Sequence, residues 1–124
     1  MAVTQLGRVQ LQIMQVLWSK GRATARDITD ALAASQPIAH STVQTLLRGL
    51  EEKGAISHEM EGRTFIFFPL VEEDKFVQSA TRDLIERVFG GSAGMLVAHL
   101  LKNENVTRDE LDAIRELIDR HIKK

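Results

Sequence analysis

The pattern of apolar and polar positions predicts three helices in the first half of the chain. Aliphatic side chains recur at helical spacing over residues 6–19, 25–34 and 40–54, and each stretch places them on one face. Thr24 stands just before the second stretch and is a good N-cap, and Asp27 can complete a capping box three residues later. The second and third helices, joined by a short turn, form a predicted helix-turn-helix.

After Gly54 the period changes from helical to alternating, which predicts two strands. Residues 56–61 alternate between apolar and polar types, residues 64–68 are β-branched and aromatic, and Pro69 closes the second strand. Three helices followed by a hairpin make a winged helix-turn-helix. In that arrangement Arg63, at the hairpin tip, can reach phosphate or the minor groove. The alternative for Arg63 is a solvated turn side chain.

The polar face of the third helix has the composition expected of a DNA recognition helix. It carries short hydrogen-bonding side chains and one long cation, and no acid appears before Glu51. Such a face can enter a major groove without repelling phosphates, whereas Glu51 and Glu52 are expected to point beyond it. By itself the pattern is equally typical of a Ser/Thr-rich surface helix. The predicted DNA-binding residues are Thr24, Ser41, Thr42, Gln44, Thr45, Arg48 and Arg63.

The rest of the chain predicts a second, helical domain at 72–124, after a winged-helix domain at 1–71. Three apolar stripes follow one another, and Thr107 with Glu110 makes a capping box for the last helix. A core of this size is too thin to be stable alone, so the stripes are expected to bury against a second copy in a C2 dimer. Packing onto the first domain is the alternative. The predicted dimerisation residues are Phe76, Ala80, Leu84, Val88, Leu96, Leu100, Leu111, Ile114, Ile118 and Ile122.

Composition and charge narrow the function classes. There is no cysteine, which excludes disulfides, thiolate metal sites and a cysteine nucleophile. The net charge is −1, but residues 1–50 hold five cations and two acids (+3), and residues 71–124 hold nine cations and eleven acids (−2). The first half can therefore meet a polyanion while the second half serves another purpose.

Catalytic and cofactor-binding constellations are not apparent in the sequence. The four histidines lie far apart, Ser41 has no evident base partner, and the glycines form no phosphate loop. We therefore expect a protein that is not an enzyme and that needs neither metal nor cofactor. The chain also shows no signal peptide and no apolar run approaching the ~20 residues of a membrane span. These features predict a soluble, cytoplasmic protein without direct membrane association.

Several segments together form a signature that is more specific than a bare helix-turn-helix. They are Ile13–Trp18 in the first helix, Ser41–Leu47 with Leu50, Lys53 and Gly54 in the recognition helix, Gly62–Phe65 with Phe68 and Pro69 in the wing, and Phe89–Ser92 between later helices. In this combination the chain resembles the penicillinase-repressor family of bacterial transcriptional repressors. This family includes the repressors of β-lactamase and methicillin-resistance genes.

The resemblance implies a mainly α fold with a small hairpin wing and a C-terminal dimerisation domain. It further implies a homodimer that represses β-lactamase-type resistance or cell-wall stress genes from a palindromic operator. Induction in the family is commonly coupled to proteolysis linked to a membrane-bound sensor metalloprotease, which makes that protease a possible partner. The family's cleaved bond joins Asn to Phe, where this chain has His99 and Leu100. Gly49 stands where the family usually has a long side chain, so a phosphate-binding cation is expected to be missing there.

The predicted contacts assign different tasks to the polar residues of the recognition helix. Gln44 and Thr45 are expected to contact base edges, and Arg48 to bind guanine or phosphate. Ser41, Thr42 and Arg63 are expected to hold phosphates. Two alternatives stay open at this point: a winged-helix module whose Ser41–Arg48 face binds a protein, and a ligand-sensing winged-helix regulator.

Overall fold

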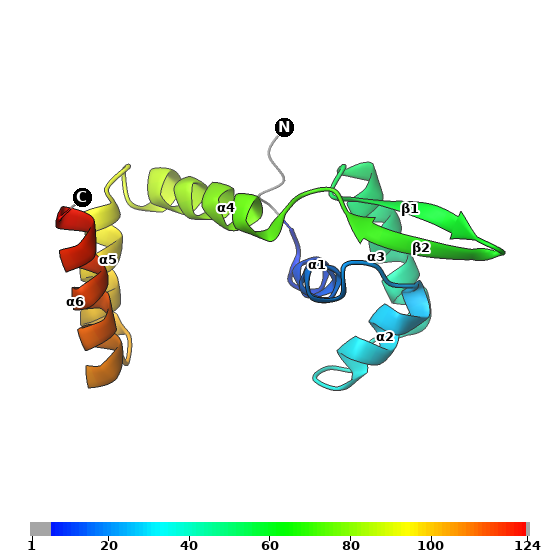
Figure 1. Ribbon diagram of the computed structural model, residues 1–124, viewed down its shortest axis with the longest axis horizontal. Helices are drawn as coiled ribbons and strands as arrows, with labels where there is room; N and C mark the ends of the chain where they lie inside the picture. The colour runs from blue at the N-terminus through cyan, green and yellow to red at the C-terminus, as the bar shows by residue number, and fades with distance from the viewer. Residues whose placement is uncertain (1–5, 124) are drawn as a thin grey trace. The chain divides into compact units, whose positions relative to one another are not determined.

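The computed structural model describes residues 6–123, and their contacts divide them into two units between Asp83 and Leu84. Figure 1 shows the elements in chain order. They are α1 (Arg8–Lys20), α2 (Ala25–Ala33), α3 (His40–Glu52), β1 (Ile56–Glu61), β2 (Thr64–Pro69), α4 (Glu73–Val88), α5 (Ala93–Asn103) and α6 (Arg108–Ile122). The predicted mainly helical fold with one hairpin is confirmed.

The helices of the first unit begin and end where local sequence signals place them. α1 ends at Gly21, whose φ of 82° lies in the left-handed region that favours glycine. Thr24 caps α2, because its hydroxyl accepts the Asp27 N–H at 3.0 Å and the Asp27 carboxylate accepts the Thr24 N–H at 3.1 Å. The predicted capping box is therefore confirmed, and it fixes the start of the helix that precedes the recognition helix.

The core of the first unit lies where α1, α2 and α3 pack against one another and against the base of the hairpin. The aliphatic stripes that predict these helices are the faces that become buried. Each such side chain contributes roughly 1.5–3 kcal/mol by leaving water. The largest fully buried side chains are Ile13, Met14, Leu17, Ile28, Val43, Leu47, Leu50 and Ile56.

β1 and β2 form an antiparallel hairpin that extends away from the three helices (Figure 1). Its register runs from Ile56 opposite Pro69 to Glu61 opposite Thr64, and Gly62 turns the chain with a φ of 65°. Ala23, just before α2, pairs with Phe67 through two backbone hydrogen bonds of 2.8 and 3.0 Å. The loop that leads into α2 thus anchors the second strand at its base.

The first turns of α4 belong to the first unit. The Phe76 ring is 8% exposed and lies 5.5 Å from the Trp18 ring, while the Trp18 indole N–H donates to the Val71 carbonyl at 2.8 Å. The Trp18 contacts hold the start of α4 against α1, on the first-unit side of the division at Asp83. The domain boundary after Val71 stays a prediction. Phe76, expected in a dimer interface, is already covered within its own chain.

The second unit has helices but no buried core. α5 and α6 run alongside each other in opposite directions (Figure 1), and neither contributes a buried side chain. Ser92 caps α5 by accepting the Met95 N–H at 3.1 Å, and Thr107 caps α6 by accepting the Glu110 N–H at the same distance. Apolar side chains remain exposed on both helices and at the end of α4: Leu84, Val88, Met95, Val97, Leu100, Leu101, Leu111, Ile114, Leu117, Ile118 and Ile122.

Among residues 6–123, no single helix is long and apolar enough to cross a membrane, and only α4 and α5 taken together as a bent pair reach that threshold.

Candidate nucleic-acid interface

α3 separates its apolar and polar residues cleanly. Val43, Leu47 and Leu50 are buried in the core of the first unit. The opposite side of the helix stays open to solvent, so its side chains are available to a partner. The exposed residues there include all five that the sequence predicts on this helix, Ser41, Thr42, Gln44, Thr45 and Arg48.

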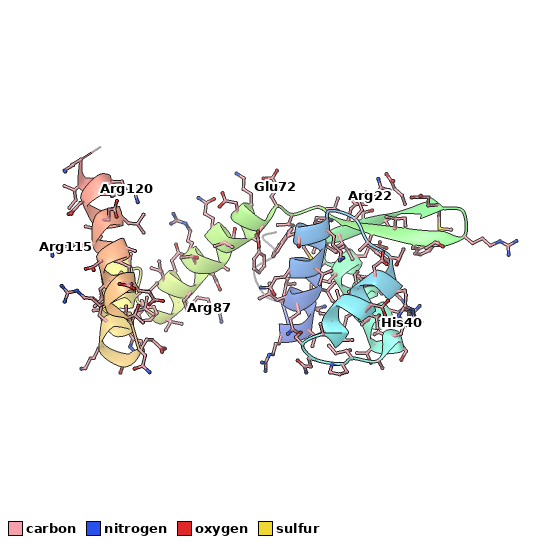
Figure 2. The ribbon with its side chains drawn as sticks, turned by 60° about the horizontal axis from the view of Figure 1, so that its bottom comes forward. Arg22, His40, Glu72, Arg87, Arg115 and Arg120 are labelled. Atoms are coloured by element: carbon pink, nitrogen blue, oxygen red, sulfur yellow. The ribbon has the colours of Figure 1, made fainter. Side chains whose placement is uncertain are left out.

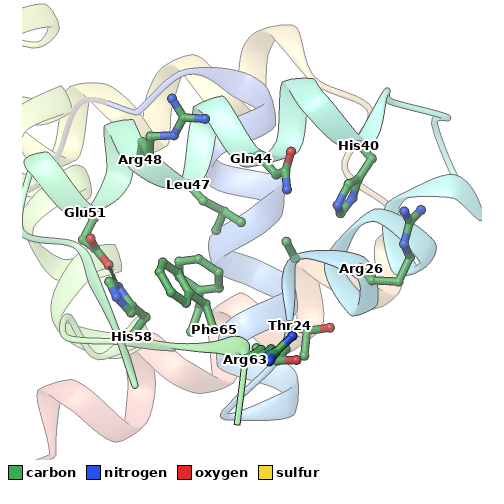
Figure 3. A pocket seen from close by; sticks show the side chains of 13 residues that line it. Thr24, Arg26, His40, Gln44, Leu47, Arg48, Glu51, His58, Arg63 and Phe65 are labelled. Carbon is green, nitrogen blue, oxygen red and sulfur yellow. Dashed lines mark hydrogen bonds and ion pairs between the residues drawn. The ribbon is translucent and has the colours of Figure 1, made fainter. Parts of the chain in front are cut away.

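A groove of about 520 Å³ lies between α3 and the hairpin, with the start of α2 also lining it (Figure 3). Its apolar part is formed by Ala25, Leu47 and the rings of Phe65 and Phe67. Its polar lining comes from all three elements and consists of Thr24, Arg26, His40, Gln44, Arg48, Glu51, His58, Arg63 and Thr64.

The charges of the groove favour an anionic partner. Arg26, Arg48 and Arg63 supply three cations from α2, α3 and the hairpin turn, and Glu51 is the one carboxylate in the lining. Cations that converge from separate elements are the usual means of holding a phosphate backbone. Two of the five cations of residues 1–50, Arg26 and Arg48, therefore lie between the recognition helix and the wing, where Arg63 joins them.

The structure brings four of the predicted DNA-binding residues together in this groove, namely Thr24, Gln44, Arg48 and Arg63. The other three, Ser41, Thr42 and Thr45, are exposed on α3 but outside the groove lining. Arg26 and His40 also line the groove, and no helical pattern in the sequence singles them out. Only the packing of α2 against α3 reveals them.

Two of the predicted residues have internal hydrogen bonds that limit what they can offer. The Thr45 hydroxyl donates to the Ser41 carbonyl at 3.1 Å, which leaves the hydroxyl oxygen as an acceptor for a base edge. The Thr24 hydroxyl accepts the Asp27 N–H, which leaves its proton free to donate to a phosphate. The Thr24 backbone N–H, and secondly the Thr24 hydroxyl side chain, lower the pKa of the Asp27 carboxyl.

The outer face of the hairpin carries acids that are paired away from the groove. Arg22 lies beside the hairpin (Figure 2), with its guanidinium 2.9 Å from the Glu59 carboxylate and 4.0 Å from that of Glu61. Strand alternation places these acids on the face opposite His58 and Phe65. Arg22 thereby offsets negative charge near the wing without entering the groove.

Glu51 does not point beyond the DNA-binding face, as the sequence suggested, but lies within the groove. Its carboxylate Oε1 is 2.5 Å from Nδ1 of His58 on β1 (Figure 3). The His58 ring is stacked on Phe65, with centroids 4.1 Å apart and planes at 9°. The helical pattern of α3 alone could not show this contact, because it depends on where the hairpin packs.

Gly49 faces α1 rather than the exposed polar side of α3. A Cβ at this position would lie 3.2 Å from Nε2 of Gln10. The Gln10 amide oxygen accepts both the Gly7 N–H and the Lys53 ammonium, each at 3.1 Å. The expectation of a missing phosphate contact at Gly49 is thereby weakened, since this position serves the α1–α3 contact.

Metal-ligating side chains are dispersed over the part of the chain that the structure describes. No group of three or more His, Asp or Glu side chains gathers there in a geometry that could hold a metal ion. The histidines that line the groove have other partners: His40 shares a hydrogen bond of 2.8 Å with the Thr29 hydroxyl, and His58 contacts Glu51.

Solved structures support the architecture. The solution structure of the DNA-binding domain of the repressor BlaI aligns with a TM-score of 0.53 and 29% identity, over 60% of this chain and 93% of that one. The Bacillus licheniformis BlaI monomer in complex with the blaP half-operator aligns with a TM-score of 0.51 and 29% identity, over the same shares of the two chains. RosR from Halobacterium salinarum shares the fold at 17% identity, with a TM-score of 0.56 over 96% of this chain and 91% of that chain.

Sequence comparison gives the same result over nearly the whole chain. The penicillinase repressor of Bacillus licheniformis is 24% identical over 119 residues, which cover 96% of this chain and 93% of that protein. The methicillin resistance regulatory protein MecI of Staphylococcus aureus is 23% identical over 116 residues, or 94% of each chain. The profile described as penicillinase repressor matches residues 6–120. The chain therefore belongs to the penicillinase repressor family.

Proposed function

We propose that this protein is a transcriptional repressor that binds a palindromic operator as a homodimer in the cytoplasm. The observation that carries the proposal is the groove between α3 and the hairpin, where three arginines converge beside an exposed recognition face. The family relationship supports it, because the relatives are repressors and one of them is solved on a half-operator. The same relationship confirms the prediction that the chain is not an enzyme.

The proposed contacts divide into those made with base edges and those made with the phosphate backbone. Gln44 and Thr45 contact base edges in the major groove, where the glutamine amide can pair bidentately with adenine. Arg48 binds guanine or phosphate from the next turn of the helix. The remaining contacts hold the phosphate backbone on either side and come from Thr24, Ser41, Thr42 and Arg63.

The second unit supports a homodimer. Its apolar side chains on α5 and α6 are exposed in the single chain, and so many exposed apolar side chains on two helices indicate an interaction site. A C2 dimer would bury these stripes against their own copies and would present two recognition helices to the two halves of a palindrome. Leu111, Ile114 and Ile118 of α6 are the proposed centre of that surface.

The proposed inducing partner is a membrane-bound sensor protease. His99 and Leu100 are both exposed on α5, so the position that corresponds to the family's cleaved bond lies at the surface of the second unit. A cut there would separate α6 from the rest of the chain. The proposed dimer would lose the exposed apolar side chains of α6, and operator binding would fall with them.

Operator binding can be tested with duplexes that the full-length protein selects from a random library. We expect tight binding at about 50 mM salt and a loss of roughly 10³–10⁵ in affinity by about 200 mM, as for proteins that contact several phosphates. Gln44→Ala is expected to cost roughly 1–3 kcal/mol and to relax the preference at one base position. Gln15→Ala, an exposed glutamine of α1, is the matched control.

Arg63 provides a second, independent part of the test. Arg63→Ala is expected to weaken binding to all duplexes and to reduce the salt slope by about 1 per protomer, or about 2 for the dimer on a palindrome, because each protomer loses one phosphate contact. Arg115→Ala, an exposed arginine of α6, serves as the matched control. Failure to bind any duplex at about 50 mM salt would instead favour a protein-interaction module, and equal binding by wild type and both variants would overturn the residue assignment.

A further inference from the structure

The wing needs contacts with the rest of the first unit, because a two-stranded hairpin is marginally stable by itself. On the face toward α3, exposure rises from base to tip: Ile56 is 1% exposed and Phe67 8%, whereas Phe65 is 45% and Met60 56% exposed. His58 lies between these two groups, at the point where the hairpin leaves the core. The orientation of the wing beyond this point therefore depends on what holds His58 on this face and, on the other face, on the ion pairs of Arg22 with Glu59 and Glu61.

His58 connects the wing to the recognition helix through two contacts. Its Nδ1 meets the Glu51 carboxylate in the last turn of α3, and its ring stacks on Phe65 from the opposite strand. Phe67 adds a tilted ring contact, with its ring centroid 5.7 Å from that of His58 and the planes at 55°. The imidazole thus connects Glu51 of α3 with Phe65 of β2. Phe65 lies two positions after Arg63, the wing residue proposed to bind phosphate.

The contact between His58 and Glu51 also determines how the negative charge of Glu51 acts in the groove. The other charged or titratable groups lining it are Arg26, His40, Arg48 and Arg63. Glu51 is three residues from Arg48 on α3, a spacing at which helix side chains meet. Without His58, the Glu51 carboxylate would be free to pair with Arg48 or to repel an incoming phosphate.

We propose that His58 is a positioning residue for operator binding, and that its protonation strengthens that binding. Through Glu51 and Phe65 it fixes the wing relative to α3, and as imidazolium it neutralises Glu51 beside the phosphates. Operator affinity is therefore expected to rise as the pH falls. The inference rests on the proposed function and adds a determinant of affinity to the same site.

The test measures operator affinity of the full-length protein at about pH 6 and pH 8, at one ionic strength, on the selected duplex. Wild type is expected to bind about two- to fivefold more tightly at pH 6, the factor that a partly exposed charge pair supplies. His58→Gln is expected to lose this ratio and to bind more weakly at pH 6. Glu51→Gln is expected to lose the ratio by binding at pH 8 nearly as tightly as at pH 6.

His40→Gln is the matched control, because His40 lines the same groove but bonds Thr29 instead of Glu51. It is expected to keep the pH ratio. Amide NMR spectra of the free proteins separate wing displacement from unfolding: His58→Gln should shift signals of residues 63–67 and of the end of α3 while the core signals stay in place.

Three results would overturn the inference. The first is a His58→Gln protein with wild-type affinity and an unchanged pH ratio. The second is a His40→Gln protein that loses the ratio. The third is an NMR spectrum of His58→Gln in which the wing signals do not move. If wild type selects no duplex at either pH, the proposed function fails instead, and the NMR comparison still decides whether His58 positions the wing.

Discussion

The two units of this chain use similar apolar patterns in opposite ways. In the first unit, α1, α2, α3 and the hairpin bury their aliphatic stripes against one another, and Leu17 in α1 is 0% exposed. In the second unit, α5 and α6 have stripes of the same spacing, yet Leu117 in α6 is 57% exposed. A helical stripe therefore predicts a helix in either case, but not whether its partner lies in the same chain.

The difference suggests a division of labour. A unit with a closed core can hold side chains in fixed positions for reading DNA, since its stability is intramolecular. A unit whose apolar stripes are exposed gains stability from association, so its stability depends on protein concentration.

The largest effect is expected from matched leucine truncations in the two units. Leu17→Ala should lower the free energy of unfolding of the first unit by about 2–5 kcal/mol, because it removes a fully buried side chain and leaves a cavity. Leu117→Ala should change the same transition by less than about 0.5 kcal/mol. Urea unfolding followed by fluorescence of Trp18, the one tryptophan, reports on the first unit. Equal shifts for the two variants would contradict the contrast.

The start of α4 gives a sharper test of where the units divide. Phe76→Ala should destabilise the first unit by about 3 kcal/mol, the low end for a buried phenylalanine, because its ring lies at the edge of the core against Trp18. The neighbouring Val77→Ala, at a side chain 52% exposed, is the control and should have little effect. If both variants unfold like wild type in urea, this segment belongs with the second unit.

The capping box at the start of α2 is expected to contribute less to the free energy of unfolding than the buried side chains do. Thr24→Ala should lower the free energy of unfolding by about 1 kcal/mol at pH 7, because the Asp27 N–H loses its acceptor. Since the folded-state pKa of Asp27 is lowered from 3.8, its contribution to stability is present above that pH. It is lost as the pH falls through the folded-state value.

Urea unfolding at neutral pH and at pH values below 3.8 checks the direction of this effect. Asp27→Asn should unfold with a smaller acid dependence than wild type, while Asp30→Asn, on the same helix, serves as the control. An acid dependence that is the same in wild type and Asp27→Asn would show that the cap does not act through this carboxylate.

The smallest expected effect on stability comes from a substitution at Gly49. Alanine favours the helix by up to ~1 kcal/mol, but its Cβ would press on the flexible end of Gln10, so we expect a net gain of about half that or less. In a Gln10→Ala background, Gly49→Ala should raise the melting temperature by more than it does in wild type, because the Gln10 amide no longer opposes the Cβ. The reference is Gln10→Ala alone, since that variant loses the hydrogen bonds to the Gly7 N–H and the Lys53 ammonium. A loss of stability in the Gly49→Ala single variant would mean that the Gln10 amide cannot move aside.

Local signals account for what the sequence could predict. Helical and strand periods, the Thr24 cap and the Gly62 turn each act within a few residues, and the structure places the corresponding elements as expected. The exposed face of α3 was predictable for the same reason. Its polar residues are exposed because the stripe at Val43, Leu47 and Leu50 is buried.

Contacts between elements account for what the sequence could not predict. Phe76 continues the stripe of α4, and nothing in its spacing shows that it meets Trp18. Glu51 looks like an ordinary acid at a helix end until the hairpin places His58 beside it. In each case the partner comes from another element, and only the packing of the folded chain brings the two together.

The division of labour can be tested directly by comparing a palindromic duplex with its half-site. The measurement is the affinity of full-length wild type and of Ile118→Glu, which places a charge in the exposed stripe of α6. The account predicts that the variant binds the half-site as wild type does but loses about 100-fold or more on the palindrome, because linked binding of two recognition helices is lost. Unchanged binding to the palindrome, or an equal loss on both duplexes, would contradict it.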